Sequence, residues 1–380
     1  MKIPKIIAFY FPQFHPIKEN DKWWGKGFTD WDLVKKAKPL FEGHNQPREP
    51  INDDYYNPCK KETLARQSLL AKKYGVEGFM FYHYWFDGKL LLEKPMEVFL
   101  ECKDIDISFC VCWANESWTR AWTGKPEVLL KKQLHSTDKK IWKKHFDYLL
   151  PFFKDPRAIK IDEKPIFLIY QPFLIDNSNE MIAYFNEQAI KNGLPGIYFT
   201  AVKNHSYHSH EFLKPYSAVM KFQPREAYSS KAFLNQNTAS RLQILRKLPH
   251  IIQLFLTKLY QKISKHKIYD SEKLWSIILK NAYKNEFKKY SLKIFESAFF
   301  EWDNTARYKR NAKIFPPLNK SKTKKNFKKL TEKAINNNSP FIFFNAWNEW
   351  SEAAYLEPDK VNGLEELEVI KDVLDELKSI

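Results

Sequence analysis

Runs of apolar and aromatic residues recur eight times along the chain. Most are apolar at every position rather than at alternate ones, which is typical of parallel strands covered on both faces. Segments of helical pattern lie between several of the runs; one, 62–74, is followed by Gly75, a residue that often ends helices. The predicted strands are 6–11, 78–84, 108–113, 165–170, 197–201, 218–222, 297–302 and 341–347. Eight such strands with intervening helices predict an α/β fold, a (β/α)8 TIM barrel.

The barrel is predicted to occupy residues 1–380 as one domain, with a basic helical insertion at 226–295 before the seventh strand. Residues 225–300 contain 15 Lys and Arg against 5 Asp and Glu, within a net charge of +17 for the chain. The simplest interpretation is a solvated helical insertion. A segment that contacts an anionic membrane surface has the same composition, and so does a nucleic-acid-binding segment, although we expect no nucleic-acid partner.

Several features favour a cytoplasmic location, at the inner face of the membrane if the basic insertion contacts lipid. The first apolar run is interrupted by Pro12 and lacks a small-residue cleavage site, so it resembles a strand more than a signal peptide. The chain has no apolar segment of about 18 residues. The four cysteines match no zinc-binding spacing, and we expect them to be reduced: Cys59, Cys102, Cys110 and Cys112.

Polar and aromatic side chains follow every predicted strand. The carboxyl ends of TIM-barrel strands meet at one face, which holds the active site. Hydrogen-bonding groups and indole rings arriving there predict a sugar-binding cleft, although any one of them alone is an ordinary loop residue. Some of the Trp residues are expected to face the cleft and others the core. The candidates are Gln13, His15, His83, Tyr84, Trp85, Trp113, Asn115, Glu116, Trp118, Tyr170, Gln223, Asp303, Asn304, Trp347, Asn348 and Trp350.

Two carboxylates, Glu349 and Glu352, follow the last predicted strand. Glu is a poor strand former and costly in a core, so its position at a strand end beside Trp needs a reason. Two solvated glutamates are one interpretation. Cleavage or formation of a glycosidic bond is the other, because it uses a carboxylate pair beside flat apolar rings. We predict that Glu349 and Glu352 are catalytic, with Glu352 protonated at rest and Glu349 ionised.

Other chemistries fit the sequence less well. His15, His83 and Glu116 lack a metal-ligand spacing, and no serine lies in a G-x-S-x-G motif. The Gly-rich loops that hold nucleotide phosphates are also missing from the sequence. We therefore predict neither a metal ion nor a cofactor.

Seven motifs, in order over nearly the whole chain, resemble the WbsX family, whose members are encoded with O-antigen and capsule biosynthesis genes and are usually labelled glycosyltransferases. The basic insertion resembles the family least. The motifs are FYFPQFHP, NDKWWGKGFTDW, EGFMFYHYWFDGKLLLEKP, CWANESWTR, IDEKPIFLIYQP, EWDNTAR and FNAWNEWSEAAYLEPD.

The WbsX family in turn resembles glycoside hydrolase family 99, retaining endo-α-mannosidases built on a (β/α)8 barrel. That resemblance implies that Glu352 is the general acid/base. It also implies that Glu349 deprotonates the sugar 2-hydroxyl, which closes onto C1 as an anhydro-sugar. Asn348 matches the Asn of that motif, whereas Ser351 stands where those hydrolases have His.

The resemblance implies a carbohydrate-active enzyme of surface-polysaccharide biosynthesis. It is either a glycosyltransferase of the WbsX type or a retaining endo-glycosidase or transglycosylase, and its expected partner is an oligosaccharide or lipid-linked glycan. A catalytically silent glycan-binding barrel is the alternative. The presence of both Glu349 and Glu352 disfavours it, because binding alone does not require two neighbouring carboxylates.

Overall fold

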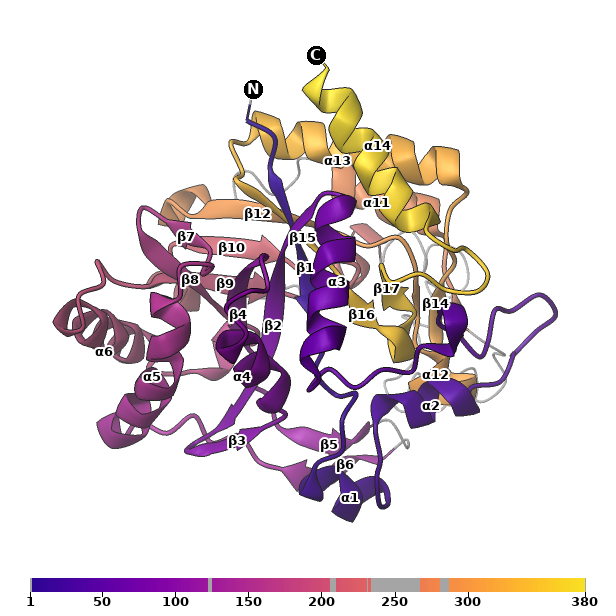
Figure 1. The fold of residues 1–380 in the computed structure, drawn as a ribbon. Coiled ribbons are helices and arrows are strands. Elements are labelled where there is room, and N and C mark those ends of the chain that lie inside the picture. The colour runs from indigo at the N-terminus through magenta and orange to yellow at the C-terminus, as the bar shows by residue number, and fades with distance from the viewer. Residues whose placement is uncertain are drawn as a thin grey trace, which may run out of the picture.

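Eight parallel strands form a closed barrel in the computed structural model, which describes residues 2–121, 125–205, 210–230, 232–233, 267–280 and 287–379 (Figure 1). Each strand pairs with its neighbours in chain order, and the first also pairs with the last. The TIM-barrel prediction is therefore confirmed. The strands are β1 (Lys5–Tyr10), β2 (Val76–Phe86), β4 (Ser108–Trp113), β8 (Lys164–Ile169), β9 (Tyr198–Lys203), β10 (Ala218–Lys221), β12 (Lys293–Ala298) and β15 (Phe341–Phe344).

The seventh barrel strand does not lie where it was predicted. The prediction was 297–302, whereas β12 begins at Lys293 and ends at Ala298. The error arises from Glu296, a charged residue that disfavours a buried strand in the sequence. In the structure two lysines neutralise it: Lys221 Nζ lies 3.0 Å and Lys333 Nζ 3.2 Å from Glu296 Oε1. The end of the predicted strand forms β13 (Trp302–Asp303), which pairs with β14 (Lys313–Phe315) outside the barrel.

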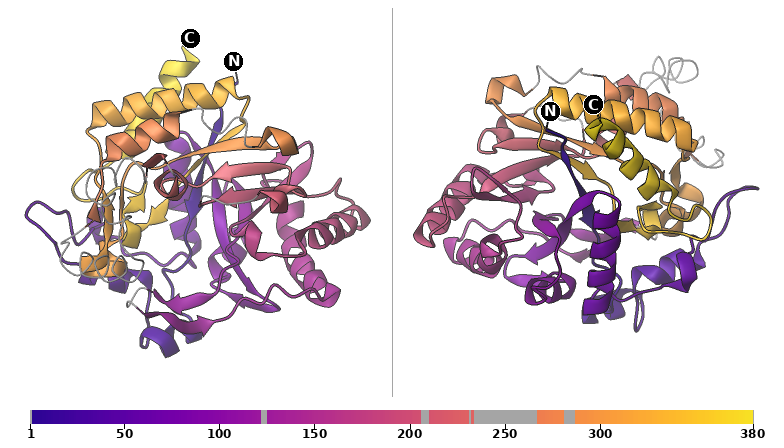
Figure 2. Two further views of the ribbon diagram at one scale, coloured as in Figure 1. Left: turned by 180° about the vertical axis from the view of Figure 1, so that it is seen from behind. Right: turned by 45° about the horizontal axis from the view of Figure 1, so that its top comes forward.

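Helices cover the outer face of the barrel (Figures 1 and 2). The helix predicted at 62–74 is α3, and Gly75 after it has a positive φ of 87°, a backbone conformation that glycine adopts without strain. The outer helices are α3 (Lys61–Lys73), α4 (Lys94–Glu101), α5 (Lys139–Lys154), α6 (Ser178–Lys191), α11 (Ser271–Leu279), α13 (Lys320–Asn336) and α14 (Glu365–Lys378).

Shorter elements complete the fold, several of them in the loops after the barrel strands. They are α1 (Lys18–Trp24), α2 (Asp30–Lys36), α7 (Arg225–Ser229), α12 (Thr305–Tyr308), β3 (Lys89–Leu91), β5 (Trp118–Arg120), β6 (Lys125–Lys131), β7 (Lys160–Ile161), β11 (Lys267–Ile268), β16 (Asn348–Glu349) and β17 (Ala354–Tyr355).

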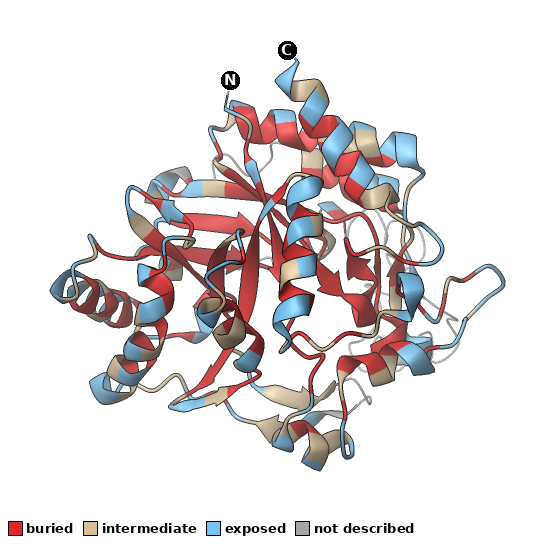
Figure 3. Ribbon diagram, in the orientation of Figure 1, coloured by how far each residue is buried: buried red, intermediate tan, exposed pale blue. Residues whose placement is uncertain are grey.

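Alternate residues of each barrel strand face two different apolar layers, and both are buried (Figure 3). In β1, Ile7 and Phe9 fill the barrel interior, whereas Ile6 and Ala8 pack under the helices. Since successive side chains of a strand point to opposite faces, every second residue at a strand end points away from the barrel mouth.

The predicted basic insertion is described only in part. Residues 234–266 and 281–286 lie outside the described residues, and the last three positions of 226–295 belong to β12. Within the described part, α11 packs against α13, with Leu274 and Trp275 fully buried. No helix of the described residues has the length and apolar character needed to cross a bilayer.

Candidate active site

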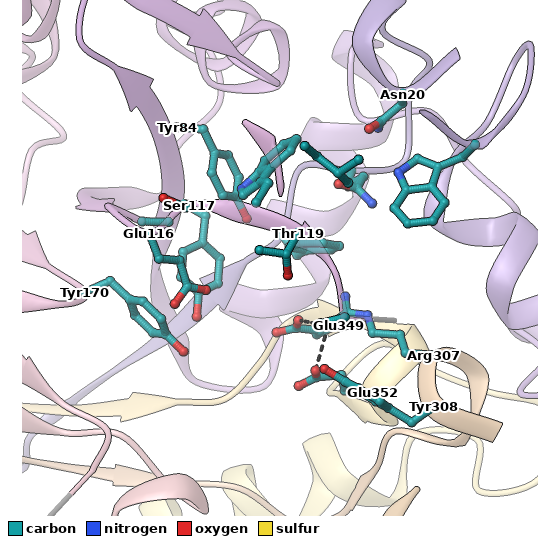
Figure 4. Close-up of a pocket in the computed structure, with 18 of the residues that line it drawn as sticks. Asn20, Tyr84, Glu116, Ser117, Thr119, Tyr170, Arg307, Tyr308, Glu349 and Glu352 are labelled. Carbon is teal, nitrogen blue, oxygen red and sulfur yellow. Dashed lines mark hydrogen bonds and ion pairs between the residues drawn. The ribbon is translucent and has the colours of Figure 1, made fainter. Parts of the chain in front are cut away.

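A pocket of about 210 Å³ opens at the carboxyl ends of the barrel strands (Figure 4). Residues from both ends of the chain line it, since Gln13 follows β1 and Glu349 follows β15. Of the predicted site residues, the pocket brings together Gln13, Tyr84, Glu116, Trp118, Tyr170, Glu349 and Glu352. It adds residues that were not predicted, among them Phe11, Asn20, Trp24, Tyr82, Arg225, Arg307 and Tyr308.

A tight turn directs both glutamates into this pocket. β16, which contains Glu349, pairs antiparallel with β17, and Glu352 lies in the 3-10 turn between them. Ala353 closes the turn in the left-handed conformation, with φ 48°. A residue other than glycine is strained there, and such strain is common at functional sites.

Arg307 holds the two carboxylates together. Its Nη1 donates to Glu349 Oε1 at 3.0 Å and to Glu352 Oε1 at 2.6 Å, and all three side chains are buried. Figure 4 shows them side by side, with Glu116 and Tyr170 on another side of the pocket. A third carboxylate, Asp30 of α2, lies 3.7 Å from Arg307 Nη2.

The surroundings of Glu352 favour its ionised form. Burial alone would raise its pKa, but the charges of Arg307 and Arg225 and hydrogen bonds from Trp302 and Arg307 outweigh burial and hold the pKa below its usual value. Trp302 Nε1 donates to Glu352 Oε2 at 2.8 Å, and Arg225 Nη2 lies 3.7 Å from Oε1.

Glu349 has the opposite tendency. Burial and the charge of Glu352 raise its pKa to about 7, although Arg307 and Arg225 oppose the shift. At neutral pH the proton of the pair therefore resides more on Glu349 than on Glu352. This reverses the order predicted from the sequence, because the sequence does not show that Arg307, Arg225 and Trp302 gather around Glu352.

The raised pKa of Glu349 predicts a pH-dependent effect of Glu349→Gln on stability. The native pKa of about 7 lies above the ordinary value for an unfolded chain, so Glu349 favours the folded state at low pH. That contribution is lost as pH rises through 7. The free energy of unfolding of Glu349→Gln, relative to that of wild type, should therefore rise by on the order of 3 kcal/mol between pH 4 and pH 8. Denaturant unfolding at several pH values tests this, and a constant difference would contradict it.

Gln13 and Asn20 present unpaired polar atoms at the pocket. Both side chains are buried, and Gln13 Nε2 and both polar atoms of Asn20 have no hydrogen-bond partner among the described residues. Asp30 N donates to Gln13 O at 2.8 Å, which fixes the loop after β1. Buried polar atoms left without partners are suited to a ligand's hydroxyl groups.

Trp118 is the one predicted Trp that lines the pocket within the described part of the chain, where Tyr84 packs edge-on against it at 5.0 Å. Trp347 is instead fully buried in the layer beneath the helices.

The different positions of these two Trp residues predict different effects of substitution. Trp347→Ala should cost about 3–5 kcal/mol of stability. Trp118→Ala should weaken oligosaccharide binding with a much smaller loss of stability. Thermal melts and glycan titrations on both variants test this; equal destabilisation without a binding defect would contradict it.

Four other predicted cleft residues point away from the pocket, so their prediction as substrate contacts is wrong. His83 and Trp85 of β2 and Trp113 of β4 belong to the outward-facing set of their strands and pack around His145 of α5. His83 Nε2 lies 2.9 Å from His145 Nε2, and burial lowers the pKa of His83 to about 3. With Trp347 they form core beneath the helices.

A second group supports the loops instead of lining the pocket. Asn348 Oδ1 accepts from Phe11 N at 2.7 Å, which ties β16 to the loop after β1. Asn115 Oδ1 accepts from Gln171 N at 2.7 Å. Three more predicted substrate contacts also bind neighbouring protein groups instead of lining the pocket. His15 pairs with the backbone oxygen of Pro12, Gln223 with Glu226, and Trp350 with Glu357.

Asp303 and Asn304 position α12, the short helix that contains Arg307. Asp303 Oδ1 accepts from Thr305 N at 2.9 Å, and its Oδ2 lies 2.8 Å from His44 Nε2. Asn304 Oδ1 accepts from Lys313 N at 2.8 Å. Neither residue lines the main pocket, although Asn304 lines an adjoining cavity. Arg307 itself was missed because it follows β12 by nine residues. The one sequence signal for it was its place in the EWDNTAR motif.

A closed (β/α)8 barrel with a buried carboxylate pair in a pocket at the carboxyl ends of its strands has the layout of a barrel enzyme. The chain belongs to the WbsX glycosyltransferase family, because the sequence model of that family, described as "Glycosyltransferase WbsX", matches residues 6–370. Membership places it among carbohydrate-active proteins and confirms the resemblance seen in its motifs.

Two curated relatives are similar to the chain over nearly its whole length. "Uncharacterized protein WxcX" of Xanthomonas campestris pv. campestris strain B100 is 29% identical over 378 residues, which cover 97% of this chain and 49% of that protein. The counterpart of strain ATCC 33913 is also 29% identical, with the same coverage. The chain thus spans about half the length of these curated relatives.

Solved structures share the fold. A GH99 endo-α-mannosidase of Bacteroides thetaiotaomicron, solved with BIS-TRIS-propane, has a TM-score of 0.59 at 13% identity, over 98% of this chain and 97% of that one. A glycoside hydrolase-like protein has a TM-score of 0.57 at 12% identity, over 98% and 94%. At such identities the likeness concerns the fold.

Proposed function

We propose that the protein is a retaining enzyme of surface-polysaccharide (O-antigen or capsule) biosynthesis that makes or cleaves a glycosidic bond with Glu349 and Glu352. The main support is that both buried carboxylates accept hydrogen bonds from one nitrogen of Arg307 within the pocket. Oxygens held at 3.0 and 2.6 Å from one atom are closer together than the roughly 6.5–9.5 Å separation of an inverting pair.

The roles implied by the resemblance to family 99 give a balanced two-step reaction. First, Glu349 takes the proton of the sugar 2-hydroxyl, O2 bonds C1, and Glu352 gives its proton to the departing oxygen. Then water or a sugar hydroxyl loses its proton to Glu352 and attacks C1, while Glu349 returns a proton to O2. Each step inverts C1, so the configuration is retained. Without substrate, the proton of the pair resides mainly on Glu349, and Glu352 is ionised. The second step begins from these same protonation states.

The pocket supplies the other needs of such a substrate. Trp118, Tyr84 and Tyr170 offer rings for a sugar face, and Gln13 and Asn20 offer buried polar atoms for its hydroxyls. We propose an oligosaccharide or lipid-linked glycan as the substrate, with a sugar hydroxyl as acceptor in transfer or water in hydrolysis.

The test is to incubate the protein with end-labelled oligosaccharides from the surface polysaccharide of its own organism and follow the products by mass spectrometry. The anomeric configuration of the first product is read by NMR. A retained configuration supports the proposal. Inversion would exclude the two-step mechanism, and saturable binding without turnover would favour the silent glycan-binding barrel.

We also propose that the basic insertion brings the protein to the cytoplasmic face of an anionic membrane. Each Lys or Arg near such a surface contributes about 1 kcal/mol, and salt screens the attraction. The full chain should therefore co-sediment with vesicles containing anionic lipid at low salt and dissociate at high salt. Equal sedimentation with neutral and anionic vesicles would contradict the proposal.

A further inference from the structure

A second cavity, of about 480 Å³, adjoins the active-site pocket on the side of Glu352. Arg225 and Tyr308 line both spaces. Trp302, whose indole donates to Glu352 Oε2, also lines the second one. Glu352 thus lies at the junction of the two spaces, where the group it acts on would extend into the second cavity.

This cavity, called here the cationic cavity, is lined by Arg225, Lys313 and His205, and no Asp or Glu is found among its lining residues in the described chain. Lys313 Nζ lies 4.5 Å from the ring centroid of Tyr228 and forms no ion pair with a described carboxylate. Arg225 has Glu352 as its ion-pair partner, at 3.7 Å. Burial and the charges of Arg225 and Lys313 lower the pKa of His205, so its imidazole is mainly neutral at neutral pH.

The two cationic groups and His205 come from separate elements that the fold holds in place. Arg225 begins α7, the helix that follows β10, and His205 follows β9. Lys313 begins β14, and its backbone N donates to Asn304 Oδ1. Cations placed apart around a cavity suit a ligand with more than one charged centre, whereas a sugar carboxylate is typically bound by one bidentate arginine.

We propose that the cationic cavity binds the diphosphate of an activated sugar, with the sugar in the active-site pocket and the diphosphate as the leaving group. The inference rests on the proposed function and narrows its substrate. In the first step O2 loses its proton to Glu349 and bonds C1, the bond between C1 and the diphosphate oxygen breaks, and the electron pair leaves with the diphosphate beside Arg225 and Lys313. In the second step the acceptor hydroxyl bonds C1, the bond between O2 and C1 breaks, and Glu349 returns the proton to O2. The proton of the acceptor hydroxyl passes to Glu352 and then to solvent.

The diphosphate has two chemical sources, a nucleoside diphosphate sugar and a lipid diphosphate sugar. Isothermal titration of the full chain with inorganic pyrophosphate, uridine diphosphate and geranyl diphosphate separates them. Tighter binding of uridine diphosphate than of the other two assigns a nucleotide carrier, and tighter binding of geranyl diphosphate assigns a lipid carrier. Equal affinities support recognition of the diphosphate itself. Titration with glucuronate tests the alternative that the cationic cavity binds the carboxylate of a sugar.

Lys313→Gln should weaken pyrophosphate binding about tenfold or more, because it removes a charged contact. Lys313→Arg should retain most of the pyrophosphate affinity. That result would attribute the loss in Lys313→Gln to the missing charge and not to misfolding. Lys325→Gln, an exposed lysine of α13, should bind like wild type. Undetectable pyrophosphate binding, equal affinity in Lys313→Gln and wild type, or preference for glucuronate would overturn the inference.

Binding is also measured in Glu349→Gln, which distinguishes this inference from the proposed function. That variant should lose glycosidic chemistry and keep its pyrophosphate affinity. If pyrophosphate binds through Lys313 while Glu349→Gln retains full turnover, the proposed function fails and the anion site stands. If Glu349→Gln is inactive and pyrophosphate does not bind, the inference alone fails.

Discussion

Glu352→Gln should lower turnover of an unactivated glycan by about 10²–10⁴-fold, the usual contribution of a general acid/base. A substrate with a good leaving group should be affected far less in its first step, because that group departs without a proton. Glu349→Gln should impair both substrates, since formation of the O2–C1 bond is lost. Steady-state and burst kinetics on the two substrates measure the difference.

Glu116→Gln provides the matched control for these variants. Glu116 also lines the pocket, but its described hydrogen bond is to Gln171 Nε2, at 3.0 Å, and not to Arg307. Its substitution should raise KM with little change in kcat. Near wild-type turnover in both Glu349→Gln and Glu352→Gln would remove the carboxylate pair from the mechanism.

The barrel was predictable from the sequence because its strands are apolar at nearly every position. The same property hid which strand residues face the barrel mouth. His83 and Tyr84 are adjacent in β2, yet Tyr84 lines the pocket and His83 packs against α5. In strands with polar residues on one face, alternation would have separated them. Here both faces are buried, and the alternation carries no polarity signal.

The carboxylate pair was predictable because two glutamates beside a buried strand are unusual. Their proton distribution was not. It depends on Arg307, Arg225 and Trp302, which lie 42 to 127 positions from the glutamates in sequence and meet them only in the fold. The shifted seventh strand has a similar origin, since the partners of Glu296 are in β10 and α13.

Arg307→Met should destabilise the protein by about 3–5 kcal/mol near pH 8, the range for removing one partner of a buried ion pair. It would leave Glu349, Glu352 and Asp30 together without the cation that they share. Arg310→Met, an exposed substitution three residues further along, is the matched control and should change stability by less than about 0.5 kcal/mol.

The loss in Arg307→Met should shrink as the pH falls. In wild type the pKa of Glu352 is held below its usual value, so its ionised form stabilises the fold above the pKa of the unfolded chain. Without Arg307 that contribution is lost, and burial favours the neutral form of each carboxylate. Protonation at pH 4–5 then relieves the repulsion. Denaturant unfolding from pH 4 to pH 8 should show a growing gap between Arg307→Met and wild type. A gap independent of pH would mean that Arg307 acts mainly through packing, such as its contact with the ring of Phe11 at 5.3 Å.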